Sequence, residues 1–317
     1  MSKILSRLSK IKFRLKLWAF KRIICSKDAW SIFNQASIPG FGTNLIRLYF
    51  PIYRSHLNGN DSFSPELKKQ FSELFGAATA KTTILEGIDP IKRLVMDLPL
   101  KEKNSIEPYL DNYFFGAVDA LVLGAMMNKH KPTQIIEIGS GISTRYMKLF
   151  KNHFNLNTKI VCIDPEPRSE ISGATDILIK KPFESAIARN DLKLNPGDFL
   201  FMDGSHYVFQ NNDTLSFFFK VLPSLPAGVI IHIHDIYLPY DYPENVTDQL
   251  WSEQYILAAM LLGGFKGFRV LLPTYYLSKV DMAFQAVTEE INRSFNERPF
   301  ELRSKHNEGY SFWMEKI

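Results

Sequence analysis

Residues 133–164 constrain the possible fold more than any other part of the chain. The segment Thr133-Gln-Ile-Ile-Glu-Ile-Gly-Ser-Gly-Ile-Ser-Thr-Arg145 runs from an apolar stretch through two glycines into a helix-like stretch. A second apolar run, Lys159-Ile-Val-Cys-Ile-Asp164, then ends on an acid. This order predicts a strand, a tight turn, a helix and a parallel strand that ends in a carboxylate. Such a unit forms a pocket for an adenosine-containing cofactor at the carboxyl ends of its strands.

The candidate cofactor residues are Gly139, Ser140, Gly141 and Asp164. The two glycines end the first strand, where a side chain would block the close approach of a ligand. Ser143 or Thr144 could cap the following helix, whose N-terminus favours negative groups. Asp164 ends the second strand, where its carboxylate could accept hydrogen bonds from both hydroxyls of a ribose.

Glu137 and Thr144 separate the possible cofactors. A dinucleotide fingerprint requires a third glycine at position 144, where this chain has threonine. Glu137, two residues before the first glycine, is unfavourable beside a pyrophosphate. A carboxylate there suits a positively charged ligand, or supports the site from behind. The pattern therefore favours a sulfonium cofactor with an amino-acid tail over a nicotinamide dinucleotide.

The rest of the chain alternates apolar runs with helical patterns, which predicts a doubly wound, mainly parallel sheet. A turn is expected at Asp89-Pro90, because proline favours turns, and a helix is expected to begin at Ser64-Pro65. Strands are predicted at Gln134–Ile138, Ile160–Asp164, Asp176–Ile179, Asp198–Asp203, Val229–Asp235, Phe268–Leu272 and Tyr310–Met314, and helices at Phe114–Met127, Ser143–His153 and Gln249–Leu262.

Two later strands end in residues that can carry chemistry. Gly197-Asp-Phe-Leu-Phe-Met-Asp-Gly-Ser-His206 supplies Asp203 and His206, and Gly228-Val-Ile-Ile-His-Ile-His-Asp-Ile-Tyr237 supplies His234 and Asp235. Both strand ends should face the crevice that holds the cofactor. Carboxylates and imidazoles there could act as a general base or bind a divalent metal ion.

Asp203, Asp235 and His206 could also have roles other than catalysis. Asp203 could cap the turn that follows it, and Asp235 could orient His234. His206 could bind the cofactor rather than the acceptor. His232, which alternates with isoleucines, is better explained as a buried histidine with a satisfied partner.

At Glu137-Ile-Gly-Ser-Gly141 and Asp164 the chain resembles the class I S-adenosylmethionine-dependent methyltransferases. The glycine segment is similar to their first motif and the aspartate to their ribose-binding acid. The resemblance implies a Rossmann-like seven-stranded sheet with a reversed last strand. It also implies cofactor contacts near Glu137, Gly139, Ser140, Gly141 and Asp164.

Phe201–Pro243 resembles a bacterial methyltransferase group that tailors small molecules or glycans and, more distantly, catechol and macrolide-sugar O-methyltransferases. In those families an acid after the fourth strand and an acid pair after the fifth hold magnesium. Asp203 and Asp235 match two of these acids, but the third position is Ile236. The resemblance leaves open both a divalent metal site at Asp203 and Asp235 and a metal-free mechanism with His206 or His234 as base.

The chain is expected to have three parts: a basic amphipathic arm (1–27), a helical N-terminal extension (28–110) and a methyltransferase domain (111–317). Nine of the 38 Lys and Arg residues lie in the arm, which holds no acid, so the remaining 29 face 33 Asp and Glu residues. The arm could contact an anionic membrane surface, while a mildly acidic body argues against a nucleic-acid substrate. The extension could cover the mouth of the cofactor pocket.

The chain holds only two cysteines and no apolar run long enough to span a bilayer, which favours a cytoplasmic location. Beyond Asp235, the aromatic stretch Tyr237–Trp251 could form a lid over the acceptor or anchor a loop on the extension. We therefore expect methyl transfer to an oxygen, and less readily to a nitrogen, of a small-molecule or glycan acceptor. The alternatives are a nicotinamide-dependent sugar oxidoreductase and a non-catalytic scaffold with a methyltransferase-like fold.

Overall fold

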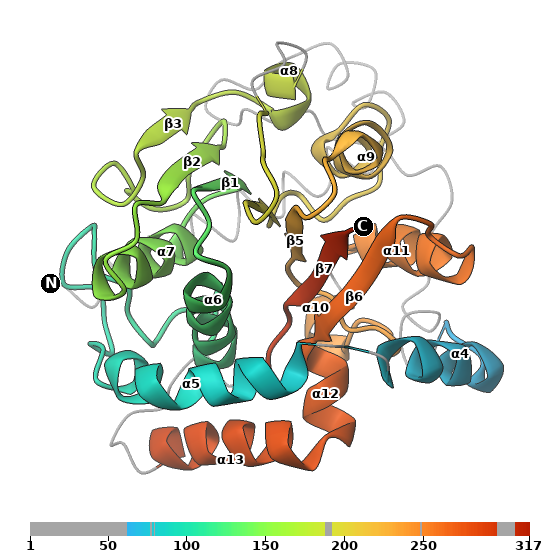
Figure 1. Cartoon of the computed structure of the whole chain (residues 1–317), viewed down its shortest axis with the longest axis horizontal. Coiled ribbons are helices and arrows are strands. Elements are labelled where there is room, and N and C mark those ends of the chain that lie inside the picture. The colour runs from blue at the N-terminus through green and yellow to red at the C-terminus, as the bar shows by residue number, and fades with distance from the viewer. Residues whose placement is uncertain (1–61, 77, 79, 188–191, 248, 297–307) are drawn as a thin grey trace, which may run out of the picture. The chain divides into compact units, whose positions relative to one another are not determined.

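The computed structural model describes residues 62–317, apart from 77, 79, 188–191, 248 and 297–307 (Figure 1). The basic arm (1–27) and the part of the expected extension up to residue 61 lie outside the described residues. Within the described part of the chain, no helix combines the length and the apolar character needed to cross a bilayer.

A seven-stranded sheet organises the described residues, in the order β3-β2-β1-β4-β5-β7-β6. The first five strands of the chain pair in parallel, whereas β7 runs antiparallel to both β5 and β6. The Rossmann-like sheet with a reversed last strand is therefore confirmed. The strands are β1 (Gln134–Ile138), β2 (Lys159–Ile163), β3 (Ile177–Ile179), β4 (Phe199–Met202), β5 (Ile230–Ile233), β6 (Phe268–Pro273) and β7 (Phe312–Lys316).

Successive strand residues point to opposite sides of the sheet, so both faces carry apolar side chains. Helices cover both of these faces. Ile135 of β1 belongs to one core, which includes α5 (Lys81–Met96), α6 (Ala117–His130), α7 (Ile142–His153) and α13 (Met282–Asn296). Ile136 belongs to the other core, which includes α4 (Pro65–Gly76), α8 (Phe183–Ile187) and α11 (Glu253–Leu262). The remaining helices are α9 (Asp213–Ser216), which continues as a π-helical turn (Phe217–Val221) and a 3₁₀ turn (Leu222–Ser224), α10 (Glu244–Thr247) and α12 (Thr274–Val280).

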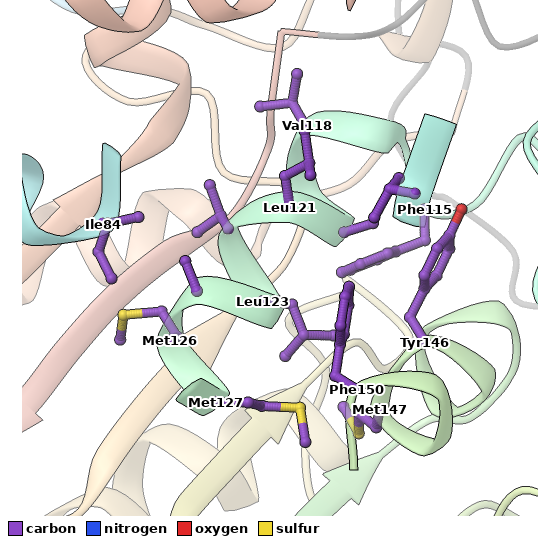
Figure 2. Close-up of a cluster of buried hydrophobic side chains, with 14 of the residues drawn as sticks. Ile84, Phe115, Val118, Leu121, Leu123, Met126, Met127, Tyr146, Met147 and Phe150 are labelled. Carbon is purple, nitrogen blue, oxygen red and sulfur yellow. The ribbon is translucent and has the colours of Figure 1, made fainter. Parts of the chain in front are cut away.

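Helix α6 is buried along most of its length. Side chains of α5 and α7, among them Ile84 and Phe150, pack around it in Figure 2, and its own residues from Ala117 to Met127 are all buried. A helix enclosed on every side is apolar all round rather than along one stripe. Asp119, its one acidic residue, is fully buried as well.

The structure corrects the turn expected at Asp89-Pro90, because Pro90 lies inside helix α5. A proline within a helix removes one backbone hydrogen bond and costs about 3 kcal/mol. The helix persists because its apolar face, which includes Ile84, Ile88 and Ile91, is buried in the core. Tertiary packing thus outweighs a local turn signal.

Other boundaries differ by a few residues from those expected. The helix predicted from Gln249 begins only at Glu253, and the helix predicted at Phe114–Met127 is α6, shifted by three residues. Helix α4 starts at Pro65, as predicted. Helices α12 and α13 carried no prediction.

Candidate functional site

A cavity of about 990 Å³ lies at the carboxyl ends of the parallel strands. It brings together two sets of residues that the sequence separates widely. The first set, Gly139, Ser140, Gly141 and Asp164, follows β1 and β2, and the second, Asp203, His206, His234 and Asp235, follows β4 and β5. Both predicted groups therefore meet at one cavity, as expected for the edge of a doubly wound sheet.

The two glycines of the turn after β1 meet different surroundings. Gly139 has a φ of +76°, and a Cβ atom there would lie 1.8 Å from the carbonyl oxygen of Asp203. At Gly141 a Cβ atom would meet nothing within 4 Å. Gly139 therefore lets the β1 turn pass the backbone after β4, while Gly141 leaves space beside the cavity. Of the two, Gly141 alone has the open surroundings that close approach of a ligand requires.

Glu137 points away from the cavity and into the interior. Its carboxylate is fully buried and accepts hydrogen bonds from the Ser143 and Thr144 hydroxyls, each at 2.5 Å, and from Cys162 Sγ at 3.2 Å. Burial raises the pKa of Glu137 to about 7, against the opposing effect of these donors. Of its two predicted roles, the geometry shows the supporting one, because the carboxylate holds the first turn of α7 rather than facing a ligand.

Thr144 closes the cap of α7 that the sequence predicted. Its hydroxyl accepts a hydrogen bond from the Gly141 amide at 3.1 Å while donating to Glu137. The side chain that replaces the third glycine of a dinucleotide fingerprint thus connects the turn to the buried acid. Two linked hydrogen bonds, from the Gly141 amide to Thr144 and from Thr144 to Glu137, hold the turn in place.

Asp164 lines the cavity at the end of β2. One of its carboxylate oxygens accepts hydrogen bonds from the amide (2.9 Å) and hydroxyl (3.0 Å) of Ser140, and the other accepts one from the Glu166 amide (2.8 Å). These bonds fix the carboxylate between the glycine turn and the loop after β2. Oδ2 thus has two donors and Oδ1 one, so Oδ1 keeps acceptor capacity for a further donor from the cavity.

His206 contacts three carboxylates. Its Nδ1 lies 2.7 Å from Glu253 Oε1, and its Nε2 lies 3.5 Å from both Asp203 Oδ1 and Asp235 Oδ2. Burial disfavours a charged imidazole, but the neighbouring carboxylates outweigh it and raise the pKa of His206 to about 9. The ring also packs against Trp251, with centroids 4.5 Å apart.

His234 occupies the other side of the same carboxylate pair. Its Nδ1 lies 3.8 Å from Asp203 Oδ1 and 3.5 Å from Asp235 Oδ2, and its Nε2 lies 3.6 Å from Asp119 Oδ2. Burial opposes the charged form of His234, yet Asp235, Asp203 and Asp119 hold its pKa well above the usual range.

The pKa values of Asp203 and Asp235, which lie between the two imidazoles, shift in opposite directions. Burial raises the pKa of Asp203. Burial also acts on Asp235, but there the neighbouring His234 and His206 outweigh it and lower the pKa.

His232 is structural, as predicted. The ring is fully buried, its Nε2 lies 2.9 Å from the Ser311 hydroxyl, and it stacks on Phe201 with centroids 3.6 Å apart. Burial lowers the pKa of His232 well below its usual range, so the ring stays neutral. It supports the sheet beneath His234 without reaching the cavity.

The aromatic stretch after β5 combines features of both predicted roles. Tyr237 and Trp251 line the cavity, as a wall beside the acceptor would. Asp241, between them, accepts hydrogen bonds from the Ser62 amide at 2.9 Å and from the Ser62 and Tyr255 hydroxyls. The stretch is thus tied to the residues that precede α4 while its rings face the site.

Asp119 and Glu253 also contact the histidines of the site, although neither was predicted from the sequence to lie there. Asp119 accepts hydrogen bonds from the Tyr310 and Ser311 amides and from the Ser311 hydroxyl, and its second oxygen faces His234. An isolated acid in an otherwise apolar helix is a signal that could have identified Asp119. Glu253 opens an ordinary helix, and its pairing with His206 depends on a contact between distant segments.

Comparison with known proteins agrees with this architecture. Residues 136–236 match a family described as a methyltransferase domain. No curated protein matches the sequence significantly. The matched residues run from β1 through β5 of a sheet whose strand order is Rossmann-like.

Several solved methyltransferase structures are similar at low identity. They include an O-methyltransferase from Streptomyces achromogenes involved in tomaymycin synthesis, in complex with S-adenosylmethionine (14% identity over 80% of this chain and 96% of that chain, TM-score 0.37). A methyltransferase from Podospora anserina bound to S-adenosylhomocysteine (13% identity, 81% and 97%, TM-score 0.37) and a plantazolicin methyltransferase in complex with S-adenosylhomocysteine (13% identity, 79% and 99%, TM-score 0.40) are also similar.

Proposed function

We propose that this chain catalyses S-adenosylmethionine-dependent methyl transfer to an oxygen of a small-molecule or glycan acceptor. The observation that carries the proposal is the single cavity that joins the glycine turn and Asp164 to the Asp203, His206, His234 and Asp235 cluster. The cofactor supplies an electrophilic methyl group on a sulfonium sulfur. The protein then has to bind, orient and deprotonate the acceptor.

The cofactor half fits an adenosine-containing group. Space is open at Gly141, and Asp164 lines the cavity with free acceptor capacity on Oδ1. We assign to Asp164 the binding of vicinal ribose hydroxyls, and to Ser140 and Gly141 the binding of the amino-acid portion. Gly139 and Glu137 hold the turn that presents these groups.

The acceptor half supplies the groups that handle a proton. His206 Nε2 and His234 Nδ1 both face the Asp203 and Asp235 carboxylates, so either imidazole is placed to act as base in its neutral form, which the neighbouring carboxylates make harder to reach by raising the pKa of both rings. The carboxylates orient the hydroxyl group of the acceptor and offset the charge that develops on the base. Tyr237 and Trp251 supply an aromatic wall that suits the ring of a sugar or a phenol.

Calorimetric titration with S-adenosylhomocysteine tests the cofactor assignment. We expect the wild-type chain to bind it and Asp164→Ala to bind it at least 10-fold more weakly, because ribose contacts of about 1.5–3 kcal/mol to a charged acceptor are lost. NADH serves as the competing ligand. Absence of S-adenosylhomocysteine binding, or preferential binding of NADH, would contradict the proposal and favour a nicotinamide-dependent sugar oxidoreductase.

Turnover with a panel of sugars and phenols tests the catalytic assignment. His206→Asn and His234→Asn should each lower turnover more than they lower S-adenosylhomocysteine affinity, because these side chains face the acceptor half of the cavity. A chain that binds the cofactor but methylates nothing in a broad panel would favour the non-catalytic scaffold.

We further propose a cytoplasmic location with peripheral membrane contact through residues 1–27. The nine basic residues of this arm and its lack of acids support the contact. Cys162, which is buried and unpaired, suits a reducing compartment. Co-sedimentation of the full chain with anionic vesicles, compared with a chain lacking residues 1–27, tests the membrane contact.

A further inference from the structure

We propose that Arg145 is a positioning residue for the cofactor half of the cavity. Its buried guanidinium connects two segments that form part of the cavity wall, the pre-α6 segment (residues 99–116) and the post-β2 segment (residues 164–174). The link to a cofactor rests on the proposed function, whereas the connection between the two segments does not.

Both segments carry residues that line the cavity. The pre-α6 segment supplies Asn112 and Phe114, and the post-β2 segment supplies Asp164, Glu166 and Ser169. In the chain the two segments are separated by α6, β1, α7 and β2. The way in which they are held together therefore decides the shape of the cavity on the side of Asp164.

Arg145 donates hydrogen bonds to the backbone of both segments. It follows Thr144 at the start of α7, and its side chain is fully buried. Nη1 donates to the carbonyl oxygens of Asn104 at 3.1 Å and Glu107 at 3.5 Å, and Nη2 donates to the carbonyl oxygen of Glu170 at 3.0 Å. One planar group thus binds the pre-α6 segment on one side and the post-β2 segment on the other.

The use of a buried cation at this position points to a role beyond filling space. Burying a guanidinium is unfavourable unless it is paired and hydrogen-bonded, and an apolar side chain would fill the same volume without that penalty. Here Glu102 Oε1 lies 2.8 Å from Nη1 of Arg145, and the Glu102 side chain is 53% exposed. The fixed fork of an arginine aims several donors at once, which the single ammonium of a lysine does not reproduce.

Hydrogen bonds within the pre-α6 segment carry this anchoring to the cavity. The Leu110 amide donates to the Pro99 carbonyl at 2.9 Å. The Asp111 amide donates to the Leu100 carbonyl, also at 2.9 Å. These bonds close the segment into a compact loop, and Asn112, the next residue, lines the cavity. A displacement of the loop at Arg145 would therefore move a cavity-lining residue as well.

Two contacts nearer the surface join the same segments. A Cβ atom at Gly173 would lie 2.6 Å from Cγ1 of Ile106, so only a glycine lets the two segments approach this closely. The guanidinium carbon of Arg168 lies 5.6 Å from the centre of the Phe114 ring, within the range of a cation–π contact. Ile106 and Phe114 are 46% and 47% exposed, so Arg145 is the buried part of the connection.

Hydrogen–deuterium exchange of the full chain without ligand tests the connection. In Arg145→Met the amides of residues 101–111 and 168–174 should exchange about 10-fold faster than in the wild type, because both segments lose their shared donor. Leu261→Ala is the matched control, because it removes a buried side chain from the core on the other face of the sheet. It should not raise exchange selectively in these two segments. Unchanged exchange in either segment of Arg145→Met would overturn the inference.

Two milder variants keep the test decisive if Arg145→Met does not fold. Arg145→Lys keeps the charge and loses the fork, so it should still raise exchange in both segments. Gly173→Val forces the segments apart at an exposed position while Arg145 stays in place, and it should raise exchange in the same two ranges. Wild-type exchange in Arg145→Lys would refute the role of the guanidinium.

Calorimetric titration with S-adenosylhomocysteine separates a positioning role from a merely structural one. Folded Arg145→Lys and Arg145→Met should bind it about 10-fold more weakly than the wild type, although Arg145 does not line the cavity, because the wall segments lose their support. Leu261→Ala should bind it as the wild type does, whatever its loss of stability. Wild-type affinity in the folded Arg145 variants would leave Arg145 a structural residue and overturn the inference.

The inference and the proposed function fail separately. A wild-type chain that does not bind S-adenosylhomocysteine refutes the cofactor assignment, while the exchange experiment still decides whether Arg145 connects the segments. A wild-type chain that binds S-adenosylhomocysteine, with Arg145 variants that match it in exchange and affinity, retains the cofactor site and loses the positioning role.

Discussion

The two ends of the cavity differ in how completely their polar groups are paired. At the glycine turn, the Asp164 and Glu137 carboxylates each accept three hydrogen bonds from neighbouring protein groups. At the other end, neither nitrogen of His234 has a partner within hydrogen-bond distance among the described residues, and its carboxylate neighbours stand at 3.5–3.8 Å. The acids at the first end are thus held by short hydrogen bonds, whereas His234 at the second end is held by longer contacts with carboxylates.

This contrast separates positions where a substitution should act on folding from positions where it should act on binding. Substitutions of Gly139 and Glu137 should change stability first, because these residues hold the turn against β4 and α7. Substitutions of Gly141, which faces open space, and of the Asp–His cluster should also change ligand binding. Four predictions, in order of expected size, test this division.

Gly139→Ala should have the largest effect. The new methyl group would lie 1.8 Å from the Asp203 carbonyl oxygen, at a φ of +76° that alanine adopts poorly. Strain and overpacking together should lower the free energy of unfolding by about 4 kcal/mol. Denaturant unfolding measures this loss, and Gly141→Ala is the matched control. Equal stability of the two alanine variants would contradict the division.

Glu137→Gln should change the pH dependence of stability. The pKa of Glu137 is raised to about 7 in the folded chain, so folding favours its protonated form and loses that stabilisation as pH rises through 7. The group should therefore cost the wild type about 3 kcal/mol at pH 8 relative to pH 4. A glutamine amide does not titrate, so the variant should lack this loss of stability between pH 4 and pH 8.

Unfolding measured across that pH range should show the stability of Glu137→Gln relative to the wild type improving toward alkaline pH. Ser143→Ala removes a donor that favours the carboxylate, so it should steepen the slope instead. Parallel profiles for the wild type and Glu137→Gln would show that the acid is not the buried titrating group.

Asp119→Asn should cost about 2 kcal/mol of stability, because His234 loses a buried charge partner while the Tyr310 and Ser311 amides keep an acceptor oxygen. The same substitution should lower methyl-transfer turnover through His234, which Asp119 contacts. A stability loss with unchanged turnover would show that Asp119 is a structural residue only. Turnover assays and denaturant unfolding on one preparation give both values.

Gly141→Ala should have the smallest effect on stability, within about 0.5 kcal/mol, as is usual for substitutions away from packed contacts. Its methyl group would project into open space beside the cavity. We expect S-adenosylhomocysteine affinity to fall while the unfolding curve stays near that of the wild type. An unchanged affinity would place the cofactor elsewhere in the cavity.

The same division explains how much could be predicted from sequence. The glycine turn depends on neighbours within a few residues, so its strand, turn and helix were predicted with nearly correct boundaries. The ends of β4 and β5 were also recognisable, because an acid or histidine that closes an apolar run is a local pattern. The mainly parallel sheet followed from the alternation of strands and helices, and its seven strands with a reversed last strand followed from the family resemblance.

Long-range pairings could not be predicted. Glu253 reaches His206 across 47 residues, and Asp119 reaches Ser311 across 192. Glu253 opens an ordinary helix and carries no local signal, and the lone acid of α6 marks Asp119 without revealing its partner. The inward direction of Glu137 was likewise invisible, because a period of two assigns alternate faces but does not say which face a ligand occupies.

The enclosure of α6 has a consequence for how the protein can be divided. The helix carries Asp119 against His234, and α5, formed by residues 81–96, shields one of its sides. A fragment beginning at residue 111 would contain the seven described strands yet lose the close packing of α5 on Gly124 and Ala125 of α6. Residues 81–96 therefore belong to the core of the described chain. Removing them should loosen the packing of α6, and with it the position of Asp119 beside His234.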